Sequence, residues 1–540
     1  MTETLPGLFA RSVARWGDRD LIVTPTSRLG YAEADAASLR LARALVGAGI
    51  GKGSRVGLQF PNGPEWVTAF LAVTRVGATA VPISTFHRPP EMTWALAHSD
   101  VQLHLCQRTM FGRDFGRVLE EAVPGLARAH AGAYQEPAVP FLRSILFWGD
   151  APPWAWSAET EVERLAEGVD PELISAREEC VAPSDVALQL YSSGSTARPK
   201  AALHTHGALV RRLDVLRPFR NHVDGDRVYT PMPFFWVGGL MVGLLDALAV
   251  GHTCLVAEGA DPEATLEFLS RERVTVFSAW PAMLVALSRA YATGKYDLSA
   301  VRAGNLVEAL PPEARPKDPL LRVNALGMTE TCGPHTWGNP LVDLPEELRG
   351  SFGTSTADTE HRIVDPETGT VLGPGESGEI CVRGPNVMLG LHKVERADVF
   401  DRDGWYHTGD HGRFDASGHL FFEGRKDEMI KTAGANVSAR EVETALMAFD
   451  DVALAAVVGI PHPTRGKLVA AAVVPEKGTA PAPRELWERL RAVVSAFTVP
   501  RRIWVCTAAE MPMTASGKVD KKALERVMAD AGELLVPDEP

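Results

Sequence analysis

The chain has 540 residues, of which 45% are hydrophobic and 23% are charged, and its formal net charge is −13. This length and apolar content are enough for more than one hydrophobic core, so we expect several domains. The acidic balance argues against non-specific binding to nucleic acid or to an anionic membrane, because phosphate surfaces attract an excess of Lys and Arg. An anionic substrate therefore needs locally concentrated cations and backbone N–H groups.

The six cysteines are scattered, without a CxxC pair or a histidine at ligand spacing. We interpret them as reduced thiols of a cytoplasmic protein, and the spacing supports neither a disulfide framework nor a zinc site. The N-terminus carries charge early and has no apolar core, so no signal peptide is predicted. The longest uncharged run, residues 230–245, is shorter than the roughly 20 apolar residues of a membrane span. We expect a buried helix there, entered through a proline-rich turn, and no membrane span.

Apolar periodicity predicts alternating strands and helices in the first half of the chain. The predicted elements are a helical face at 37–45, a strand at 56–60, a helix at 65–76, a strand at 252–257, a helix at 262–272 and a strand at 274–278. Apolar strands that alternate with helices are typical of a mostly parallel sheet covered by helices. The fold class expected for this region is therefore α/β.

The pattern changes from Gly350, where Gly and Pro become dense and short apolar segments lie between them. This texture predicts hairpins and a small β subdomain. A capping pattern at Ser438 then precedes a helical face. A further helix is predicted from Leu486, Leu490, Val493 and Val494, and the last hundred residues predict a compact α+β unit. We expect a large N-terminal domain over residues 1–425 and a small, mobile C-terminal domain over residues 426–540.

A polar loop follows the apolar strand predicted at 186–190. It reads Tyr191-Ser-Ser-Gly-Ser-Thr-Ala-Arg-Pro-Lys200. Hydroxyls and backbone N–H groups donate to a polyphosphate, glycine permits close approach, and lysine adds positive charge. It is not a Walker A loop, because Pro199 stands where glycine is needed. Taken alone, the pattern fits a polar surface turn equally well. The candidate phosphate-binding residues are Ser192, Ser193, Gly194, Ser195, Thr196 and Lys200.

This loop resembles the phosphate-binding loop of the adenylate-forming superfamily, which comprises acyl-CoA synthetases, peptide-synthetase adenylation domains and luciferases. Four further segments that resemble family motifs follow in order. They are Leu326-Gly-Met-Thr-Glu330, Tyr406-His-Thr-Gly-Asp410, Gly424-Arg-Lys-Asp-Glu-Met-Ile-Lys431 and Pro512-Met-Thr-Ala-Ser-Gly-Lys518. Each motif is a weak or moderate signal by itself, but five in this order are highly specific, and the resemblance covers essentially the whole chain. Within the superfamily it favours the acyl-CoA synthetase branch, which includes fatty-acid and aryl-acid CoA ligases.

The resemblance implies that the chain joins a carboxylic acid to the α-phosphorus of ATP, expels pyrophosphate, and transfers the acyl group to coenzyme A. Two anions must meet in this reaction, so the site needs cations and donors aimed at the developing charge. By the resemblance, Glu330 would hold Mg²⁺, which prefers oxygen ligands, and Thr329 would donate to the α-phosphate. Asp410 would accept hydrogen bonds from the ribose hydroxyls.

The C-terminal motifs imply a conformational cycle. Arg425 would reach the ribose or a phosphate, and Lys518 would neutralise charge between the carboxylate and the α-phosphate. Asp427 resembles the hinge about which the family's small domain rotates. One orientation delivers the lysine, and the other brings the backbone around Gly434 towards a pantetheine tunnel.

The chain departs from the family pattern at several positions. Ala197 and Ala201 stand where the phosphate loop usually has glycine, which would stiffen that loop. Trp236 stands where many relatives have His, and Leu326 replaces an aromatic residue near the adenine. Ser438-Ala439 replaces the usual proline entry to the helix after the hinge. The residues expected to line the acyl pocket are Trp236, Val237, Gly238, Asn305, Leu326 and Gly327.

The substrate class follows from one segment. Residues 234–237 read Phe-Phe-Trp-Val, without the Asp that pairs with the ammonium group of an amino acid. An unpaired ammonium in a dry pocket costs several kcal/mol, so we expect a simple acid with an apolar or aromatic body. The acyl acceptor is expected to be coenzyme A, with an amine or a carrier-protein thiol as alternatives. A non-catalytic adenylate-binding protein is a further alternative, which intact Glu330 and Lys518 disfavour, and the oligomeric state is left open.

Overall fold

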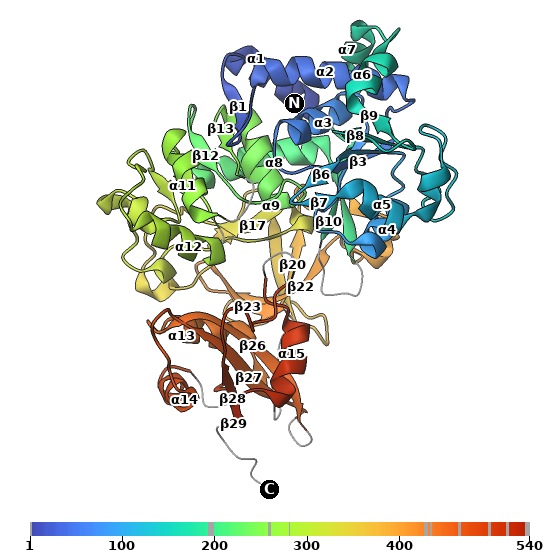
Figure 1. Cartoon of the computed structure of the whole chain (residues 1–540). Coiled ribbons are helices and arrows are strands. Elements are labelled where there is room, and N and C mark those ends of the chain that lie inside the picture. The colour runs from blue at the N-terminus through green and yellow to red at the C-terminus, as the bar shows by residue number, and fades with distance from the viewer. Residues whose placement is uncertain are drawn as a thin grey trace. The chain divides into compact units, whose positions relative to one another are not determined.

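The computed structural model describes residues 3–192, 199–257, 261–279, 281–425, 430–432, 435–462, 466–494, 498–514 and 518–534. The chain divides into two compact units. The first comprises Met1–Glu360 with Arg383–Tyr406, and the second comprises His361–Val382 with His407–Pro540. The fold is mixed α/β with one large and one small part (Figure 1), as the sequence predicts.

An eight-stranded sheet runs through the first unit in the order β21-β11-β10-β4-β3-β5-β8-β9. Strands β10, β4, β3, β5, β8 and β9 pair in parallel, whereas β11 pairs antiparallel with both β10 and β21. The parallel pairing agrees with the α/β alternation predicted from the sequence. The strands are β3 (Arg55–Gln59), β4 (Thr79–Pro82), β5 (Leu103–Gln107), β8 (Ser144–Trp148), β9 (Trp156–Ser157), β10 (Val186–Ser192), β11 (Lys200–Thr205) and β21 (Gly390–Leu391).

A second, six-stranded sheet of the first unit has the order β15-β14-β12-β13-β1-β2. All its pairs are parallel except β1 with β2. Its strands are β1 (Asp20–Val23), β2 (Arg28–Gly30), β12 (Arg227–Tyr229), β13 (Thr253–Leu255), β14 (Val276–Phe277) and β15 (Ala303–Gly304). Smaller sheets are formed by β6 (Thr109–Met110) with β7 (Arg113–Asp114), and by β16 (Leu326–Met328), β17 (Gly333–Trp337) and β18 (Thr354–Ser355).

Helices accompany both of these sheets, and α2 packs against α3 and α6. The helices predicted at 37–45, 65–76 and 262–272 are present as α2, α3 and α11, and the run at 230–245 enters a buried helical stretch. The helices are α1 (Leu5–Trp16), α2 (Tyr31–Gly47), α3 (Pro64–Arg75), α4 (Pro89–His98), α5 (Phe115–Ala122), α6 (Ala158–Ala166), α7 (Pro171–Glu179), α8 (His206–Arg220), α9 (Val237–Gly239), a π-helical turn (Leu240–Leu244), α10 (Leu245–Val250), α11 (Pro262–Arg271) and α12 (Pro281–Tyr291).

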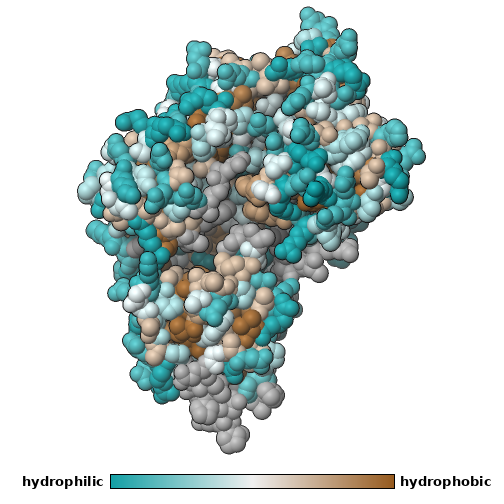
Figure 2. Space-filling view, in the orientation of Figure 1, coloured by the Kyte–Doolittle hydropathy of each residue, from teal (hydrophilic) through white to brown (hydrophobic). Residues whose placement is uncertain are grey.

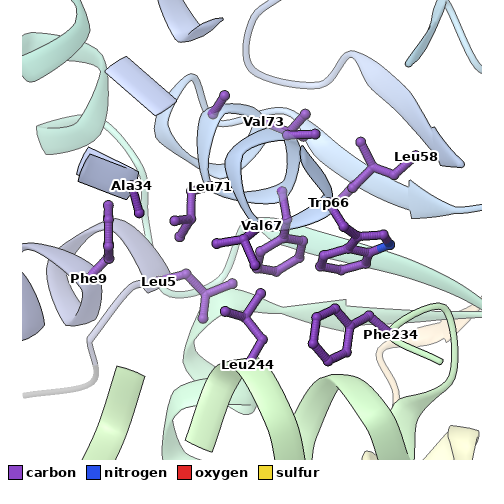
Figure 3. Close-up of a cluster of buried hydrophobic side chains, with 14 of the residues drawn as sticks. Leu5, Phe9, Ala34, Leu58, Trp66, Val67, Leu71, Val73, Phe234 and Leu244 are labelled. Carbon is purple, nitrogen blue, oxygen red and sulfur yellow. The ribbon is translucent and has the colours of Figure 1, made fainter. Parts of the chain in front are cut away.

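The main core of the first unit gathers side chains from α1, α2, α3 and the helical stretch after β12 (Figure 3). Trp66 is fully buried, stacks on Phe70 at a ring-centroid distance of 5.2 Å, and meets Phe234 edge-on, also at 5.2 Å. Each buried aromatic ring contributes a few kcal/mol of hydrophobic stabilisation. Phe234 therefore anchors the segment that continues to Trp236.

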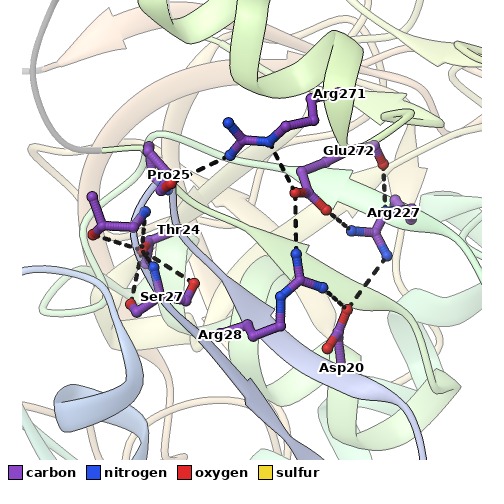
Figure 4. Close-up of polar contacts among 9 residues, drawn as sticks. Asp20, Thr24, Pro25, Ser27, Arg28, Arg227, Arg271 and Glu272 are labelled. Atoms are coloured by element: carbon purple, nitrogen blue, oxygen red, sulfur yellow. Dashed lines mark hydrogen bonds and ion pairs between the residues drawn. The ribbon is translucent and has the colours of Figure 1, made fainter.

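A polar network fixes the β1–β2 hairpin to the strands and helix beside it (Figure 4). The Arg28 guanidinium lies 2.8 Å from the Asp20 carboxylate and 3.2 Å from the Glu272 carboxylate. Arg227, at the start of β12, pairs with the same Glu272 carboxylate. Because Glu272 follows α11, these ion pairs join three elements that are distant in the sequence.

The second unit combines two sheets. One is four-stranded, in the order β19-β20-β22-β23. In the other, β25-β24-β27-β28-β29, strand β26 also pairs with β27. The strands are β19 (Glu360–Val364), β20 (Gly378–Arg383), β22 (Tyr406–Phe414), β23 (Leu420–Arg425), β24 (Ile430–Thr432), β25 (Ala435–Val437), β26 (Val452–His462), β27 (Gly466–Pro475), β28 (Arg502–Val505) and β29 (Glu533–Leu534).

Three helices complete the second unit: α13 (Ala439–Met447), α14 (Pro483–Arg491) and α15 (Lys521–Asp530). The Ser438 hydroxyl accepts a hydrogen bond from the Glu441 N–H at 3.2 Å, so the predicted N-cap is present. The helix predicted to include Val493 ends earlier, at Arg491. Val493 is 61% exposed, because the chain turns away after the helix and its side chain leaves the buried face.

The surface in Figure 2 is dominated by hydrophilic residues with small apolar patches between them. Among the described residues, no helix combines the length and the apolar character that crossing a bilayer requires. The six cysteines all lie in described segments and are free thiols, of which only Cys180 is exposed.

Candidate active site

The predicted phosphate loop connects the two strands of a hairpin in the first unit. Ser192 ends β10 and is paired with Lys200, the first residue of β11. Ser193, Gly194, Ser195 and Thr196 lie outside the described residues, as does Ala197. Ala201 is not in the loop, because the hairpin pairs as far as Lys200, and its side chain is buried within β11. A stiffer loop is therefore not expected from Ala201.

A short 3-10 turn (Thr329–Thr331) carries the predicted magnesium ligand. Glu330 is only 7% exposed, and one of its carboxylate oxygens accepts a hydrogen bond from the Ser192 hydroxyl at 3.0 Å. Its backbone carbonyl accepts from the Met388 N–H at 2.8 Å. Thr329 is half-buried in the same turn. The hairpin and the Thr-Glu turn, 138 positions apart, therefore meet at one place.

The His204 side chain holds this turn in place, a role that the sequence motifs did not indicate. The His204 Nε2–H donates to the Thr329 carbonyl at 2.8 Å, so the proton lies on Nε2. Burial lowers the pKa of His204 to about 4, despite the opposing effect of the hydrogen bond, so the ring is neutral near pH 7. The sequence signal was the His204-Thr-His206 segment after the loop. No local pattern reveals that Thr329 is the long-range partner of His204.

The predicted pocket segment follows β12. Trp236 is half-buried and is the N-cap residue of α9. Its ring packs edge-on against Phe235 at 5.5 Å and lies 6.4 Å from Phe86. The Asn62 side chain holds the segment through hydrogen bonds with the Phe234 N–H and the Met232 carbonyl, of 2.8 and 2.9 Å. Asn62 is a second positioning residue that the motifs did not indicate.

The two glycine-containing segments predicted to line the pocket are closely packed. Val237 and Gly238 begin α9, and a Cβ on the adjacent Gly239 would lie 2.2 Å from the Pro233 carbonyl oxygen. A side chain at Gly239 would therefore force the turn apart. A Cβ at Gly327 would lie 2.5 Å from the Pro334 Cα, so glycine permits the close approach of β16 and β17.

Asn305 has a structural role in addition to its predicted place in the pocket. Its side-chain amide donates to the Ala279 carbonyl at 2.6 Å and accepts from the Ala279 N–H at 3.0 Å. This joins the chain after β14 to the chain after β15. Trp236 and Asn305 thus both follow the carboxyl ends of parallel strands in one sheet, the usual edge for ligands in α/β folds. Leu326 is buried in β16 of a separate small sheet.

The second unit brings two other predicted residues together. Asp410 on β22 is paired with Arg425 on β23, and the Arg425 Nε lies 2.9 Å from the Asp410 carboxylate. The Arg425 guanidinium also donates to the Thr408 carbonyl at 3.0 Å. The Thr408 hydroxyl accepts from the Asp410 N–H at 3.0 Å and donates to the Ile380 carbonyl at 2.6 Å. The Thr-Gly-Asp motif is therefore a braced stretch of β22 whose carboxylate is already oriented.

Lys518 lies in a loop closed by its own backbone. The Thr514 N–H donates to the Lys518 carbonyl at 2.7 Å, and the Lys518 N–H donates to the Thr514 hydroxyl at 3.2 Å. These bonds present the lysine side chain at the surface, where it is exposed. Lys200 is also exposed. The hinge candidate Asp427 and the backbone at Gly434 lie outside the described residues.

Among the described residues, the predicted site residues thus form two polar arrangements, the Ser192–Glu330 contact in the first unit and the Asp410–Arg425 pair in the second, within an α/β fold. Residues 9–392 match the family model of the AMP-binding enzymes, and residues 441–518 match the model of the AMP-binding enzyme C-terminal domain. The chain therefore belongs to the AMP-binding enzyme family, and the predicted membership of the adenylate-forming superfamily is confirmed.

Curated relatives include acid–CoA ligases that align over nearly their whole length. The chain is 30% identical to the indoleacetate–CoA ligase of Aromatoleum aromaticum, and the alignment covers 94% of each chain. It is 31% identical to a feruloyl-CoA synthase of an Amycolatopsis species, over 92% of this chain and 94% of the relative. Among solved structures, an anthranilate CoA ligase in complex with anthranoyl-AMP superposes with a TM-score of 0.82 at 24% identity, covering 98% and 97% of the two chains. That likeness shows the shared fold.

Proposed function

We propose that this protein is an AMP-forming acid–CoA ligase. It activates a carboxylic acid with ATP, releases pyrophosphate, and then transfers the acyl group from AMP to the coenzyme A thiol. The observation that carries this proposal is the contact between Ser192 and Glu330, which joins the candidate phosphate hairpin to a buried carboxylate. Family membership and the acid–CoA ligase relatives support the same chemistry.

In the first half-reaction, the acid's carboxylate attacks the α-phosphorus and the bond to the pyrophosphate oxygen breaks. Thr329 donates to the α-phosphate, and Lys200 and the hydroxyls of residues 192–196 bind the outer phosphates. The Glu330 carboxylate and the Ser192 hydroxyl form an all-oxygen donor set that suits Mg²⁺. When bound, Mg²⁺ would neutralise charge on the phosphates.

The adenosine part is proposed to bind through the second unit. The Asp410 carboxylate accepts from the ribose hydroxyls, and Arg425 holds that carboxylate in place while offering further donors. Lys518 supplies positive charge to the attacking carboxylate. We propose that the small domain, residues 426–540, rotates about Asp427 between the half-reactions, so that the backbone at Gly434 reaches coenzyme A in the second.

The acid is proposed to have an apolar or aromatic body that lies against Trp236, Val237, Gly238, Asn305, Leu326 and Gly327. The wall near Trp236 consists of aromatic rings, and residues 234–237 offer no carboxylate to an ammonium group. Relatives named for indoleacetate and ferulate support an aryl acid. We also propose a cytoplasmic location, supported by the free thiols.

The direct test of the first half-reaction is exchange of labelled pyrophosphate into ATP. The proposal expects exchange that depends on an added aryl or apolar acid and does not need coenzyme A. If no acid from a broad panel supports exchange, the chain does not form acyl-adenylates and the non-catalytic alternative gains support.

A further inference from the structure

Three potential metal ligands converge on one face of the four-stranded sheet in the second unit. Glu379 and Cys381 are two positions apart on β20, so their side chains point to the same face. His407 lies on β22, the strand paired with β20. One ligand atom from each residue lies within 4.8 Å of the other two. Strand pairing creates this cluster, which the spacing of cysteines and histidines along the chain does not reveal.

The distances fit a tetrahedral ion. The His407 Nδ1 lies 3.4 Å from the Cys381 Sγ and 3.1 Å from a Glu379 carboxylate oxygen. With zinc–ligand bonds of about 2.3 Å to sulfur and about 2.0–2.2 Å to nitrogen and oxygen, tetrahedral ligands stand roughly 3.5 Å (S to N) and roughly 3.4 Å (N to O) apart. The two separations therefore need to change by only a few tenths of an ångström.

We propose that Glu379, Cys381 and His407 form a binding site for a thiophilic divalent transition-metal ion such as Zn²⁺, with water as the fourth ligand. On binding, the Cys381 thiol releases its proton to solvent, and neutral His407 coordinates through Nδ1 as the Nε2–H tautomer. A thiolate and a carboxylate then balance the charge of the ion. The His407 side chain is 40% exposed and provides the entry, while Cys381 is fully buried.

A second cluster of potential metal ligands in the described residues does not suit a metal ion. His222 and His252 flank the Asp246 carboxylate, but that carboxylate also pairs with the buried guanidinium of Arg220 at 2.6 Å. A fixed cation beside the carboxylate already neutralises it and repels a second cation. That cluster is a buried ion-pair network and carries no proposal.

The proposed metal site is connected to the Thr-Gly-Asp motif of β22. The second carboxylate oxygen of Glu379 accepts a hydrogen bond from the Gly409 N–H at 3.1 Å, one residue before Asp410. Gly409 has a left-handed φ of 73°, a backbone conformation that favours glycine at this point of β22. An ion held by Glu379 and His407 moves these two ligand atoms from 3.1 Å to roughly 3.4 Å apart, and the accompanying shift of the Glu379 carboxylate weakens its hydrogen bond with the Gly409 N–H. Resting on the proposed function, in which Asp410 binds ribose, we infer that the ion weakens ATP binding.

The test uses the full chain without a polyhistidine tag, titrated with CoCl₂ and ZnCl₂ in excess Mg²⁺. We expect about one ion per chain, a thiolate-to-cobalt absorption band, and release of about one proton. The variants C381S and H407Q each remove one ligand and should weaken zinc binding at least about tenfold. C180S is the matched control, since Cys180 is the exposed thiol and its loss should change nothing.

Two results would overturn the site: no thiolate-to-cobalt band in the wild-type protein, or zinc affinity that is equal in the wild type, C381S and H407Q. Because H407Q changes the exposed residue on the other strand, it remains informative if C381S unfolds the sheet. A band lost in C180S instead would assign the ion to the exposed thiol.

The second part of the test measures the effect of zinc on the wild type and on C381S in the pyrophosphate exchange assay. Zinc at saturating concentration should raise the KM for ATP at least about threefold in the wild type, and not in C381S, with the KM for the acid unchanged in both. An equal effect of zinc on C381S would contradict the connection to the Thr-Gly-Asp motif. If the protein shows no exchange with any acid, the proposed function fails, while the cobalt titration still decides the metal site.

Discussion

At the scale of single residues, the Thr-Glu turn depends on one neutral histidine. His204 is fully buried and donates to the Thr329 carbonyl, so it sets where the Thr329 hydroxyl and the Glu330 carboxylate point. No motif marks such a residue, because its partner is 125 positions away. The Thr-Glu pair was predictable from the motif that surrounds it, but the His204 Nε2–H group that orients the pair was not.

We expect H204F to lower the kcat of adenylation roughly tenfold, because a lost buried hydrogen bond costs about 1–3 kcal/mol and the turn loses its brace. H204Q retains an N–H donor and should keep most of the activity. Steady-state pyrophosphate release measures both, and urea unfolding controls for stability. Equal losses in H204F and H204Q would show that the donor does not matter.

The Lys518 side chain is exposed, and the hydrogen bonds described between Lys518 and Thr514 use the backbone atoms of Lys518, which leaves its side chain available to a substrate. We expect K518A to reduce adenylation at least about a hundredfold, since it removes charge that acts on the transition state. Thioester formation from supplied acyl-adenylate should be spared. K477A, an exposed lysine of the same unit, is the control. An equal loss in both half-reactions would refute the role of Lys518.

At the scale of elements, the strand–helix alternation of the first half was predictable because buried parallel strands are continuously apolar and helices keep their own period. The structure confirms α2, β3, α3, β13, α11 and β14, with shifts of a few residues at their ends. The predictions were wrong for individual side chains at the ends of elements. Ala201 joined strand β11, and Val493 fell beyond α14, because pairing and packing decide where an element stops.

The segment that contains Trp236 is expected to shape the acyl pocket, and a substitution there tests this role. Its neighbour Phe234 is locked in the core, so the ring of Trp236 is held beside Phe235 and Phe86. We expect W236A to shift the preference towards bulkier acids, because removing the indole enlarges the pocket without moving the backbone. The ratio of kcat/KM for a bulky and a small aryl acid measures this.

The control for that experiment is F141A, which removes a surface-exposed aromatic ring of the first unit. It should leave the ratio unchanged. A profile of acids that is the same for W236A and the wild type would show that Trp236 does not line the acyl pocket.

At the scale of the whole molecule, three buried histidines make stability depend on pH. Burial lowers the pKa of His104 to about 3 and the pKa values of His204 and His206 to about 4. Their unfolded pKa is near 6.5, so below that pH the unfolded chain binds more protons than the folded chain. Their contribution is complete above pH 6.5 and is lost as the pH falls towards 4.

We expect the free energy of unfolding to fall between pH 6.5 and pH 4.5, each histidine contributing up to about 1.4 kcal/mol per pH unit. H104Q keeps a polar group that can reach Gln59 and should show a shallower decline. Urea unfolding followed by tryptophan fluorescence measures the slopes. Identical slopes for H104Q and the wild type would mean that His104 is not buried in its neutral form.

The two-part organisation and the α/β class were predictable because the motifs lie in a fixed order along the chain. The meeting of Ser192 with Glu330, and of Asp410 with Arg425, required the tertiary structure. The convergence of Cys381 with His407 was equally hidden, because only the pairing of β20 with β22 brings them together. Spacing along the sequence reports on single elements, whereas these contacts join elements.

The chain activates a carboxylic acid as an acyl-adenylate and passes the acyl group to coenzyme A. The most direct measurement is pyrophosphate release from ATP with a panel of aryl and aliphatic acids, each with coenzyme A, with an amine, and with neither, while the products are identified by mass. We predict acid-dependent release that turns over only with coenzyme A and yields an acyl-CoA thioester. An amide product, or release that does not depend on the acid, would contradict this account.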